Sequence, residues 1–229
     1  MAQKYCIVNF ENEKIISVLK SYGYICIPTI KSNNVSEPIA CHADVLYLKT
    51  NNNVLYVSKC QYNNYQLLQK IGYKINNIEL NVGYKTESKL NMVITNNLIM
   101  CNPKTCTDID NFKSNKQIIY VKQGYTKCST IIINDNCFIT EDESIYKSLI
   151  NSNYKCLLID KAYVRLDGYE YGFIGGASAV LNQELLLFFG DISKHPQYNL
   201  IKEFCVNNNI NIDYIEDMQL TDIGGIVEL

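Results

Sequence analysis

Residues 129–159 read STIIINDNCFITEDESIYKSLINSNYKCLLI and contain the unit on which the fold prediction rests. Two apolar runs, Ser129–Ile133 and Cys137–Thr140, flank a turn of Asn and Asp, a pattern typical of a β-hairpin. The amphipathic stretch Asp142–Ile150 then predicts a helix, and Lys155–Ile159 predicts another strand. The unit is therefore strand, strand, helix, strand (ββαβ).

The same order of elements recurs through the rest of the chain. Further helical stretches are Glu11–Tyr22, Tyr62–Ile71, His195–Val206 and a weaker one at Thr107–Phe112. The strands expected before helices are Tyr5–Phe10, Val54–Ser58, Leu98–Asn102 and Leu185–Phe189. The strands expected after helices are Tyr24–Pro28, Lys74–Leu80, Gln117–Val121 and Asn211–Ile215. The leading strands of the other hairpins are Ala43–Leu48, Asn91–Thr95 and Ala177–Leu181.

Both ends of the chain carry an incomplete unit. The terminal strand Ile223–Leu229 has no hairpin partner after it, and Tyr5–Phe10 has no leading strand before it. Pairing these two strands removes both orphan edges. We therefore predict an α/β fold in which residues 1–229 form a single domain, a closed five-bladed ββαβ propeller whose C-terminal strand completes the N-terminal repeat. The alternative is an ordinary open α/β sheet, which the regular hairpins and the missing glycine-rich phosphate loop disfavour.

The amino-acid composition limits the classes of fold and function that suit this chain. Apolar residues make up 47% and charged residues 19%, as in a globular protein with a sizeable core. The net charge is −2, and Lys and Arg are not clustered, so we expect neither a nucleic acid nor a membrane as partner. The ten cysteines lack CxxC spacing and only two histidines exist, so we expect no metal, no cofactor and reduced thiols in a cytoplasmic protein.

In a closed ring, the starts of the five leading strands point at the centre, and we call these stretches the axial segments. The axial segments are residues 41–44, 89–91, 126–130, 175–178 and 222–225. His42 and Asp44 stand two apart, which places both on one face of a strand. Asp44 could then orient the imidazole or bind a ligand beside it. The alternative is a structural His–Asp hydrogen bond at the start of a strand.

Cys128 differs from the other cysteines because it occupies an axial segment beside Lys127. A neighbouring cation lowers the pKa of a thiol, and a Cys with a nearby His is a nucleophile arrangement. The alternative is one more buried strand cysteine, and Cys41, adjacent to His42, is a competing thiol.

The remaining axial segments supply a carboxylate, small residues and an amide. Asp222 precedes Gly224 and Gly225, which allow close approach of a ligand, although it could also be a turn aspartate. Ser178 ends a stretch of small residues that leaves room for a substrate, and Asn91 occupies the equivalent point of another repeat. Two further carboxylates, Asp167 and Glu170, lie in a loop and are weaker candidates for binding.

These motifs resemble the pentein superfamily of guanidino-group-modifying enzymes, which are five-bladed ββαβ propellers. The His-x-Asp motif of those enzymes matches His42-Ala-Asp44, and their Cys-x-Thr motif matches Cys128-Ser-Thr130. Their Glu-Gly-Gly motif lies one repeat before the His, where this chain has Asp222-Ile-Gly-Gly225. The order around the ring agrees, whereas the starting point is rotated, since the enzymes carry their Cys near the C-terminus.

The resemblance implies a Cys-dependent hydrolase or amidinotransferase that acts on a guanidino or related C–N substrate. It implies that Cys128 is the nucleophile and His42 the general acid and base, while Asp44 and Asp222 hold the cationic group. Lys127 would tune the thiol or bind a substrate carboxylate, and Ser178 and Asn91 would contact the substrate. We expect a small-molecule substrate and a possible homodimer. The alternative is a non-catalytic pentein that binds a ligand or a protein at its axial face.

Overall fold

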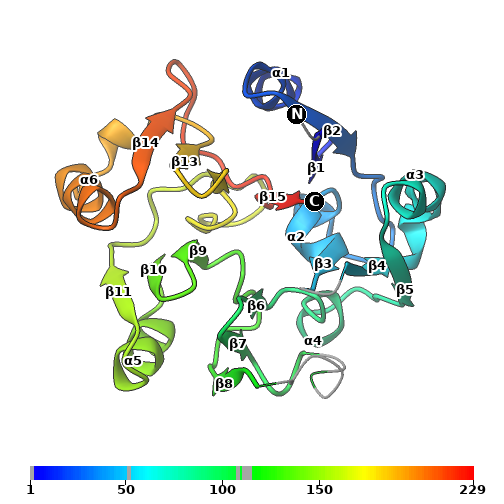
Figure 1. Ribbon diagram of the computed structural model, residues 1–229, viewed down its shortest axis with the longest axis horizontal. Helices are drawn as coiled ribbons and strands as arrows, with labels where there is room; N and C mark the ends of the chain where they lie inside the picture. The colour runs from blue at the N-terminus through cyan, green and yellow to red at the C-terminus, as the bar shows by residue number, and fades with distance from the viewer. Residues whose placement is uncertain (1–2, 51–52, 107–108, 110–114) are drawn as a thin grey trace.

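Five three-stranded sheets lie around a common centre in the computed structural model, which describes residues 3–50, 53–106, 109 and 115–229 (Figure 1). In each sheet the middle strand pairs antiparallel with the leading strand and parallel with the trailing strand. Two parallel neighbouring strands are usually joined by a right-handed crossover that contains a helix. The predicted ββαβ order therefore holds in four blades, while the helix expected in the third blade falls almost wholly outside the described residues.

The blades are named here in chain order, each with its leading, middle and trailing strand. The first blade consists of β15 (Ile226–Glu228), β1 (Lys4–Val8) and β2 (Tyr24–Pro28). The second consists of β3 (Tyr47–Lys49), β4 (Val54–Ser58) and β5 (Lys74–Ile78). The third is β6 (Val93–Ile94), β7 (Leu98–Cys101), β8 (Gln117–Tyr120). The fourth consists of β9 (Thr130–Asn134), β10 (Cys137–Thr140) and β11 (Lys155–Leu158). The fifth consists of β12 (Ser178–Leu181), β13 (Leu185–Phe188) and β14 (Asn211–Tyr214).

Helices connect the middle and trailing strands on the outside of the ring. They are α1 (Glu13–Ser21), α3 (Tyr65–Lys70), α5 (Glu143–Asn151) and α6 (Tyr198–Asn207), with the 3₁₀ turns η2 (Lys59–Asn64) and η4 (Ile192–Lys194) before two of them. The Asp142 side chain caps α5 by accepting hydrogen bonds from the Ser144 and Ile145 amides. The weaker predicted helix Thr107–Phe112 lies outside the described residues except for Ile109.

The C-terminal strand closes the ring. β15 pairs antiparallel with β1, with Ile7 opposite Val227, and the Leu229 amide donates to the Tyr5 carbonyl at 2.9 Å. Figure 1 shows the two termini side by side at this blade. The predicted closure is confirmed.

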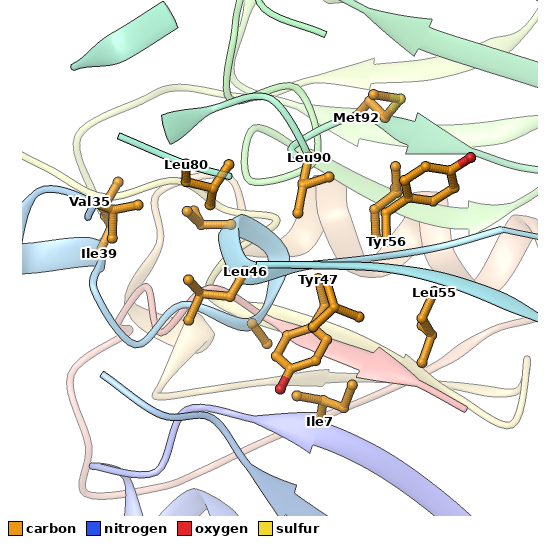
Figure 2. Close-up of a cluster of buried hydrophobic side chains, with 14 of the residues drawn as sticks. Ile7, Val35, Ile39, Leu46, Tyr47, Leu55, Tyr56, Leu80, Leu90 and Met92 are labelled. Atoms are coloured by element: carbon orange, nitrogen blue, oxygen red, sulfur yellow. The ribbon is translucent and has the colours of Figure 1, made fainter. Parts of the chain in front are cut away.

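Apolar side chains fill the space between neighbouring blades (Figure 2). Tyr47 is buried there, and its hydroxyl donates to the Oε1 of buried Gln61 at 3.0 Å. All ten cysteines are free thiols. Within the part of the chain that is described, no helix has the length and apolar character needed to cross a membrane.

One predicted leading strand is partly helical. Residues 43–46 form the short helix α2 (Ala43–Leu46), and the strand begins only at Tyr47. The His42 carbonyl accepts hydrogen bonds from the amides of Val45 and Leu46, which closes the turn. All four helical residues are buried, and so short a buried run fits a strand as well as a helix. Two short helices were not predicted, η1 (Glu37–Ile39) and α4 (Tyr84–Glu87).

Candidate active site

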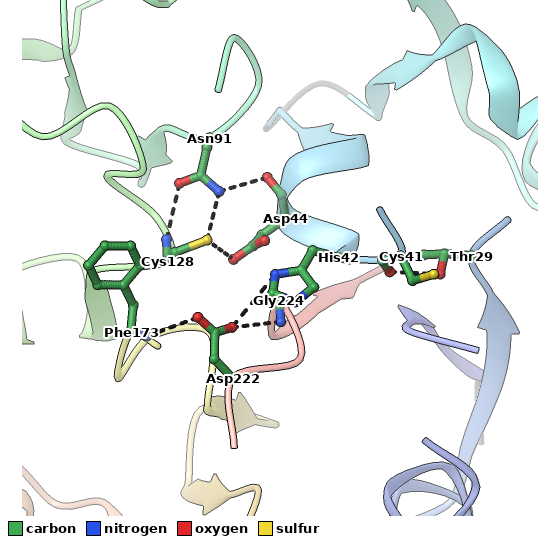
Figure 3. Close-up of polar contacts among 9 residues, drawn as sticks. All are labelled: Thr29, Cys41, His42, Asp44, Asn91, Cys128, Phe173, Asp222 and Gly224. Atoms are coloured by element: carbon green, nitrogen blue, oxygen red, sulfur yellow. Dashed lines mark hydrogen bonds and ion pairs between the residues drawn. The ribbon is translucent and has the colours of Figure 1, made fainter. Parts of the chain in front are cut away.

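The axial segments converge on one buried cluster at the centre of the ring (Figure 3). His42 immediately precedes α2, and Asp44 lies in its first turn, so the predicted placement of both on one strand face is wrong. Asn91, Cys128 and Asp222 precede β6, β9 and β15. Each of the five side chains is almost completely buried. The structure therefore brings together residues from four blades.

Cys128 lies between Asn91 and Asp44. Its thiol donates to Oδ2 of Asp44 at 2.9 Å, and Nδ2 of Asn91 donates to Sγ at 3.0 Å. The same Nδ2 lies 3.1 Å from the Asp44 carbonyl, while Oδ1 of Asn91 accepts from the amides of Lys127 and Cys128 at 2.8 and 3.1 Å. Asn91 therefore fixes the position of the sulfur. Oδ1 of Asp44 is buried without a hydrogen-bond partner.

Asp222 faces His42 from the other side of the cluster. Its Oδ1 lies 3.7 Å from Nδ1 of His42 and accepts from the Gly224 amide at 2.9 Å, while Oδ2 accepts from the Phe173 amide at 2.9 Å. Nδ1 of His42 has no hydrogen-bond partner. One ring nitrogen of His42, one oxygen of Asp44 and the Cys128 sulfur all lie within 4.8 Å of one another. These three donor atoms could also hold a metal ion.

Two glycines allow the carboxylate and the imidazole to lie this close to the backbone. A Cβ on Gly176 would lie 2.0 Å from Oδ1 of Asp222, and a Cβ on Gly224 would lie 2.3 Å from the His42 Cβ. Gly224 also has a φ of +78°, which residues with a side chain rarely adopt. The small residues predicted at the axis are therefore needed for close approach within the cluster itself.

The Cys128 thiol is not activated in the free protein. Burial and the nearby carboxylates of Asp44 and Asp222 raise its pKa well above the ordinary value. The Lys127 cation, although adjacent in sequence, does not offset burial and these two acidic neighbours. A cationic ligand placed beside the sulfur would offset the negative charges of Asp44 and Asp222 and so favour the thiolate.

Burial also shifts Asp44 and His42 toward their neutral forms. Desolvation, with help from Asp222, raises the pKa of Asp44 to about 7. Desolvation lowers the pKa of His42, which the Asp222 charge opposes. At neutral pH the cluster therefore holds a neutral imidazole and a carboxyl group close to its midpoint, both of which can exchange protons.

A cavity of about 270 Å³ opens onto His42, Cys128 and Asp222. Its outer wall is mainly aromatic and consists of Tyr84, Tyr125, Tyr169, Tyr171 and Phe173, with Ile39, Leu166, Gln123 and Glu170. Neighbouring rings of this wall pack edge to face or tilted, with centroids 5.7 to 6.4 Å apart. No described residue that lines this cavity is Lys or Arg. Sequence reasoning missed this wall, since its tyrosines lie at the start of α4, before β9 and in the loop before β12, and the only signal was a general surplus of Tyr.

The other candidate residues lie outside this cavity. Lys127 and Ser178 line a second cavity of about 520 Å³ along the ring axis, formed by the five leading strands, and Asp44 also lines it. The Ser178 hydroxyl donates to the Ile174 carbonyl at 3.0 Å. Cys41 is buried and its carbonyl accepts from Thr29, while Asp167 is exposed and paired with Arg165. Of the two loop carboxylates, only Glu170 reaches the cavity of Cys128.

Replacing Asn91 by alanine is expected to destabilise the fold by about 2–4 kcal/mol, because two backbone amides lose their acceptor inside the core. Urea unfolding followed by circular dichroism measures the loss. Asn33→Ala changes an exposed asparagine and is expected to stay within about 0.5 kcal/mol of the wild type. Equal stabilities for the two variants would contradict the role given to Asn91.

Comparisons with known proteins support the fold. The sequence profile described as "Family of unknown function (DUF6873)" matches residues 7–227. No curated protein matches the chain. A solved structure of DDAH from Pseudomonas aeruginosa, a cysteine-to-serine mutant complexed with citrulline, is 10% identical, with a TM-score of 0.63 and 100% of both chains covered.

Two further structures are similar. SxtG, an amidinotransferase from Microseira wollei in the saxitoxin biosynthetic pathway, is 9% identical, with a TM-score of 0.60, covering 94% of this chain and 89% of its own. Agmatine deiminase of C. jejuni is 10% identical, with a TM-score of 0.55, covering 93% of this chain and 87% of its own. All three are penteins, so the predicted pentein fold is confirmed.

Proposed function

We propose that this chain, which belongs to the Family of unknown function (DUF6873) and has the pentein fold, is a Cys-dependent hydrolase or amidinotransferase acting on guanidino compounds. The observation that carries the proposal is the shared cavity of Cys128, His42 and Asp222, three groups that come from different blades. The structural neighbours named above include an amidinotransferase and a deiminase, which fits this class of reaction.

In the proposed reaction Asp222 and Asp44 hold the planar guanidinium group, whose positive charge also favours ionisation of the thiol. The Cys128 thiol passes its proton to Asp44, to which it is already hydrogen-bonded, and the sulfur attacks the guanidinium carbon. Asp44 passes this proton on to the neutral His42 imidazole, and the resulting imidazolium protonates the departing amine as the carbon–nitrogen bond breaks. The amidino group then remains on the sulfur until water or a second amine, deprotonated by His42, displaces the thiolate.

The cavity wall favours a particular kind of substrate. Aromatic rings stabilise a cation and an alkyl chain, whereas a carboxylate would find no cationic partner there, since none of the described wall residues is Lys or Arg. We therefore expect butylguanidine to be turned over with a kcat/KM at least about tenfold higher than that of arginine. A preference for arginine would contradict this account of the wall.

The proposal is tested by incubating the protein with a panel of alkylguanidines and measuring release of ammonia or amine. Mass spectrometry of acid-quenched protein is expected to find an amidino adduct on the peptide that contains Cys128. Cys41→Ala provides the matched control, because this variant removes a buried thiol next to His42 that lies outside the cavity. An adduct on Cys41 instead of Cys128, or no product with any compound, would overturn the proposal.

A binding function is the second candidate, and the raised pKa of Cys128 favours it. A thiol that stays protonated in the free protein makes a poor nucleophile until a cation binds. Under this alternative, alkylguanidines raise the melting temperature of the protein, yet neither an adduct nor a product forms. The same panel therefore separates the two candidates.

A further inference from the structure

A second groove lies beside the cavity of Cys128 and does not contain the catalytic cluster. Its volume is about 820 Å³, and it shares Gln123, Tyr171 and Phe173 with that cavity as common walls. Most of the remaining wall comes from the fourth blade, including Ser129 and Glu141. A molecule in this groove is thus separated from the cavity of Cys128 by side chains that both spaces touch.

Glu141 follows β10 and is the buried carboxylate of this groove. Only 8% of its surface is exposed, and its Oε2 accepts from the Ile174 amide at 2.8 Å, while its Oε1 has no partner. The amide of the preceding residue, Phe173, binds Asp222 in the catalytic cluster. Two consecutive amides therefore hold two buried carboxylates, one for each space.

Ser129 contributes a second oxygen without a partner. Its side chain is completely buried, and its Oγ makes no hydrogen bond within the described structure. Leaving a buried oxygen without a partner is costly, and both residues line this groove, which favours a ligand that donates hydrogen bonds.

The charge of the groove favours a cation. Burial raises the pKa of Glu141 to about 8, and Asp222 adds to the shift while Lys161 opposes it. The other charged groups of the wall are Asp142, Glu143, Asp160 and Lys122. Asp142 already caps α5, and Glu143 pairs with Lys147. A cation bound at Glu141 would stabilise a carboxylate that is otherwise disfavoured.

We propose that Glu141 and Ser129 form a second ligand site that binds a primary alkylammonium group. An ammonium carries three N–H donors, which matches two separate acceptors better than a single donor would. The residues around Glu141 do not form a group suited to a metal ion; among the described residues only His42, Asp44 and Cys128 do.

The ammonium group could belong to a free amine or to the far end of a guanidino substrate whose other end lies beside Cys128. The second source rests on the proposed function and deepens it, because it makes the substrate an aminoalkylguanidine. The first source stands without it. In both cases the group recognised at Glu141 is the same.

Calorimetric titration separates the sources. Propylammonium is expected to bind the wild type and Glu143→Gln equally, and Glu141→Gln at least about tenfold more weakly. Glu143 is the matched control because it is an exposed carboxylate of the same groove. For the second source, the Cys128→Ala background keeps guanidines intact. There 3-aminopropylguanidine is expected to bind at least about tenfold more tightly than propylguanidine, and Glu141→Gln should remove the difference.

If only propylammonium binds at Glu141, the site is assigned to a free amine. If 3-aminopropylguanidine binds more tightly than propylguanidine, the site is assigned to the far end of the substrate. Both results stand even when Cys128 forms no adduct, so they are independent of catalysis. Should Glu141→Gln fail to fold, Ser129→Ala is expected to weaken the same ammonium probe at least about threefold. The proposal is overturned when Glu141→Gln and Ser129→Ala bind both ammonium probes as the wild type does, which would mean that water alone satisfies the two oxygens.

Discussion

Cys128→Ala is expected to lower kcat/KM for the best alkylguanidine by about 10³-fold or more. The reason is that the sulfur forms the covalent bond to substrate in the proposed reaction, and no neighbouring group can replace it. Asn91 and Asp44 would still occupy their places, because each also contacts backbone atoms or lies in α2. Steady-state kinetics of amine or ammonia release measures the effect, with thermal unfolding to show that the variant folds.

Two controls give this result its meaning. Cys41→Ala is expected to keep kcat/KM within about threefold of the wild type, since the Cys41 thiol lies outside the cavity. Cys128→Ala is expected to bind propylguanidine still, because Asp222 remains in place. Retained turnover in Cys128→Ala would show that the reaction does not pass through a thiol intermediate.

The ring could be predicted from the sequence because each repeat carries its own evidence. The turn of Asn and Asp before Cys137, the Asp142 cap and the helical period of Ile145 and Leu149 are local signals. Closure followed from two strands that each lacked a partner, and the pairing of Ile7 with Val227 confirms it. Local patterns were sufficient here since the repeats are short and regular.

The site could be predicted only as far as the ring geometry carries. Equivalent positions in a closed ring meet at the axis, so His42, Asp44, Asn91, Cys128 and Asp222 could be grouped from their places in the repeats. Their hydrogen bonds could not. Whether Asp44 shares a strand face with His42 depends on the helical turn Ala43–Leu46, which the local sequence does not distinguish from a strand.

Long-range contacts explain what the sequence did not reveal. The raised pKa of Cys128 comes from burial and from Asp44 and Asp222, which lie far from it in sequence, whereas the adjacent Lys127 lines the other cavity. Glu141 likewise had no signal, because its burial depends on the amide of Ile174 in the next blade. Sequence neighbours are therefore a poor guide to the electrostatics of this centre.

Raising the pH from 6.5 to 8 is expected to lower the stability of the free protein by roughly 2 kcal/mol. The folded state raises the pKa of Asp44 from 3.8 to about 7 and that of Glu141 from 4.5 to about 8. A carboxyl with a raised pKa binds its proton more tightly in the folded state, so stability falls as pH rises toward the folded value. His42, whose pKa is lowered from 6.5, acts in the opposite direction, and its contribution fades as the pH rises past about 7.5.

Urea unfolding at several pH values measures this loss. Glu141→Gln is expected to remove more than half of it, whereas Glu143→Gln should leave it unchanged, because Glu143 is exposed and its pKa is lowered by Lys147. A saturating cationic ligand should reduce the loss of stability in the wild type. The reason is that a ligand that binds the ionised carboxylates stabilises the folded state at high pH. A flat profile between pH 6.5 and 8 in the free protein would show that both carboxylates ionise as they do in water. The electrostatic argument for a cationic ligand would then fail at both sites.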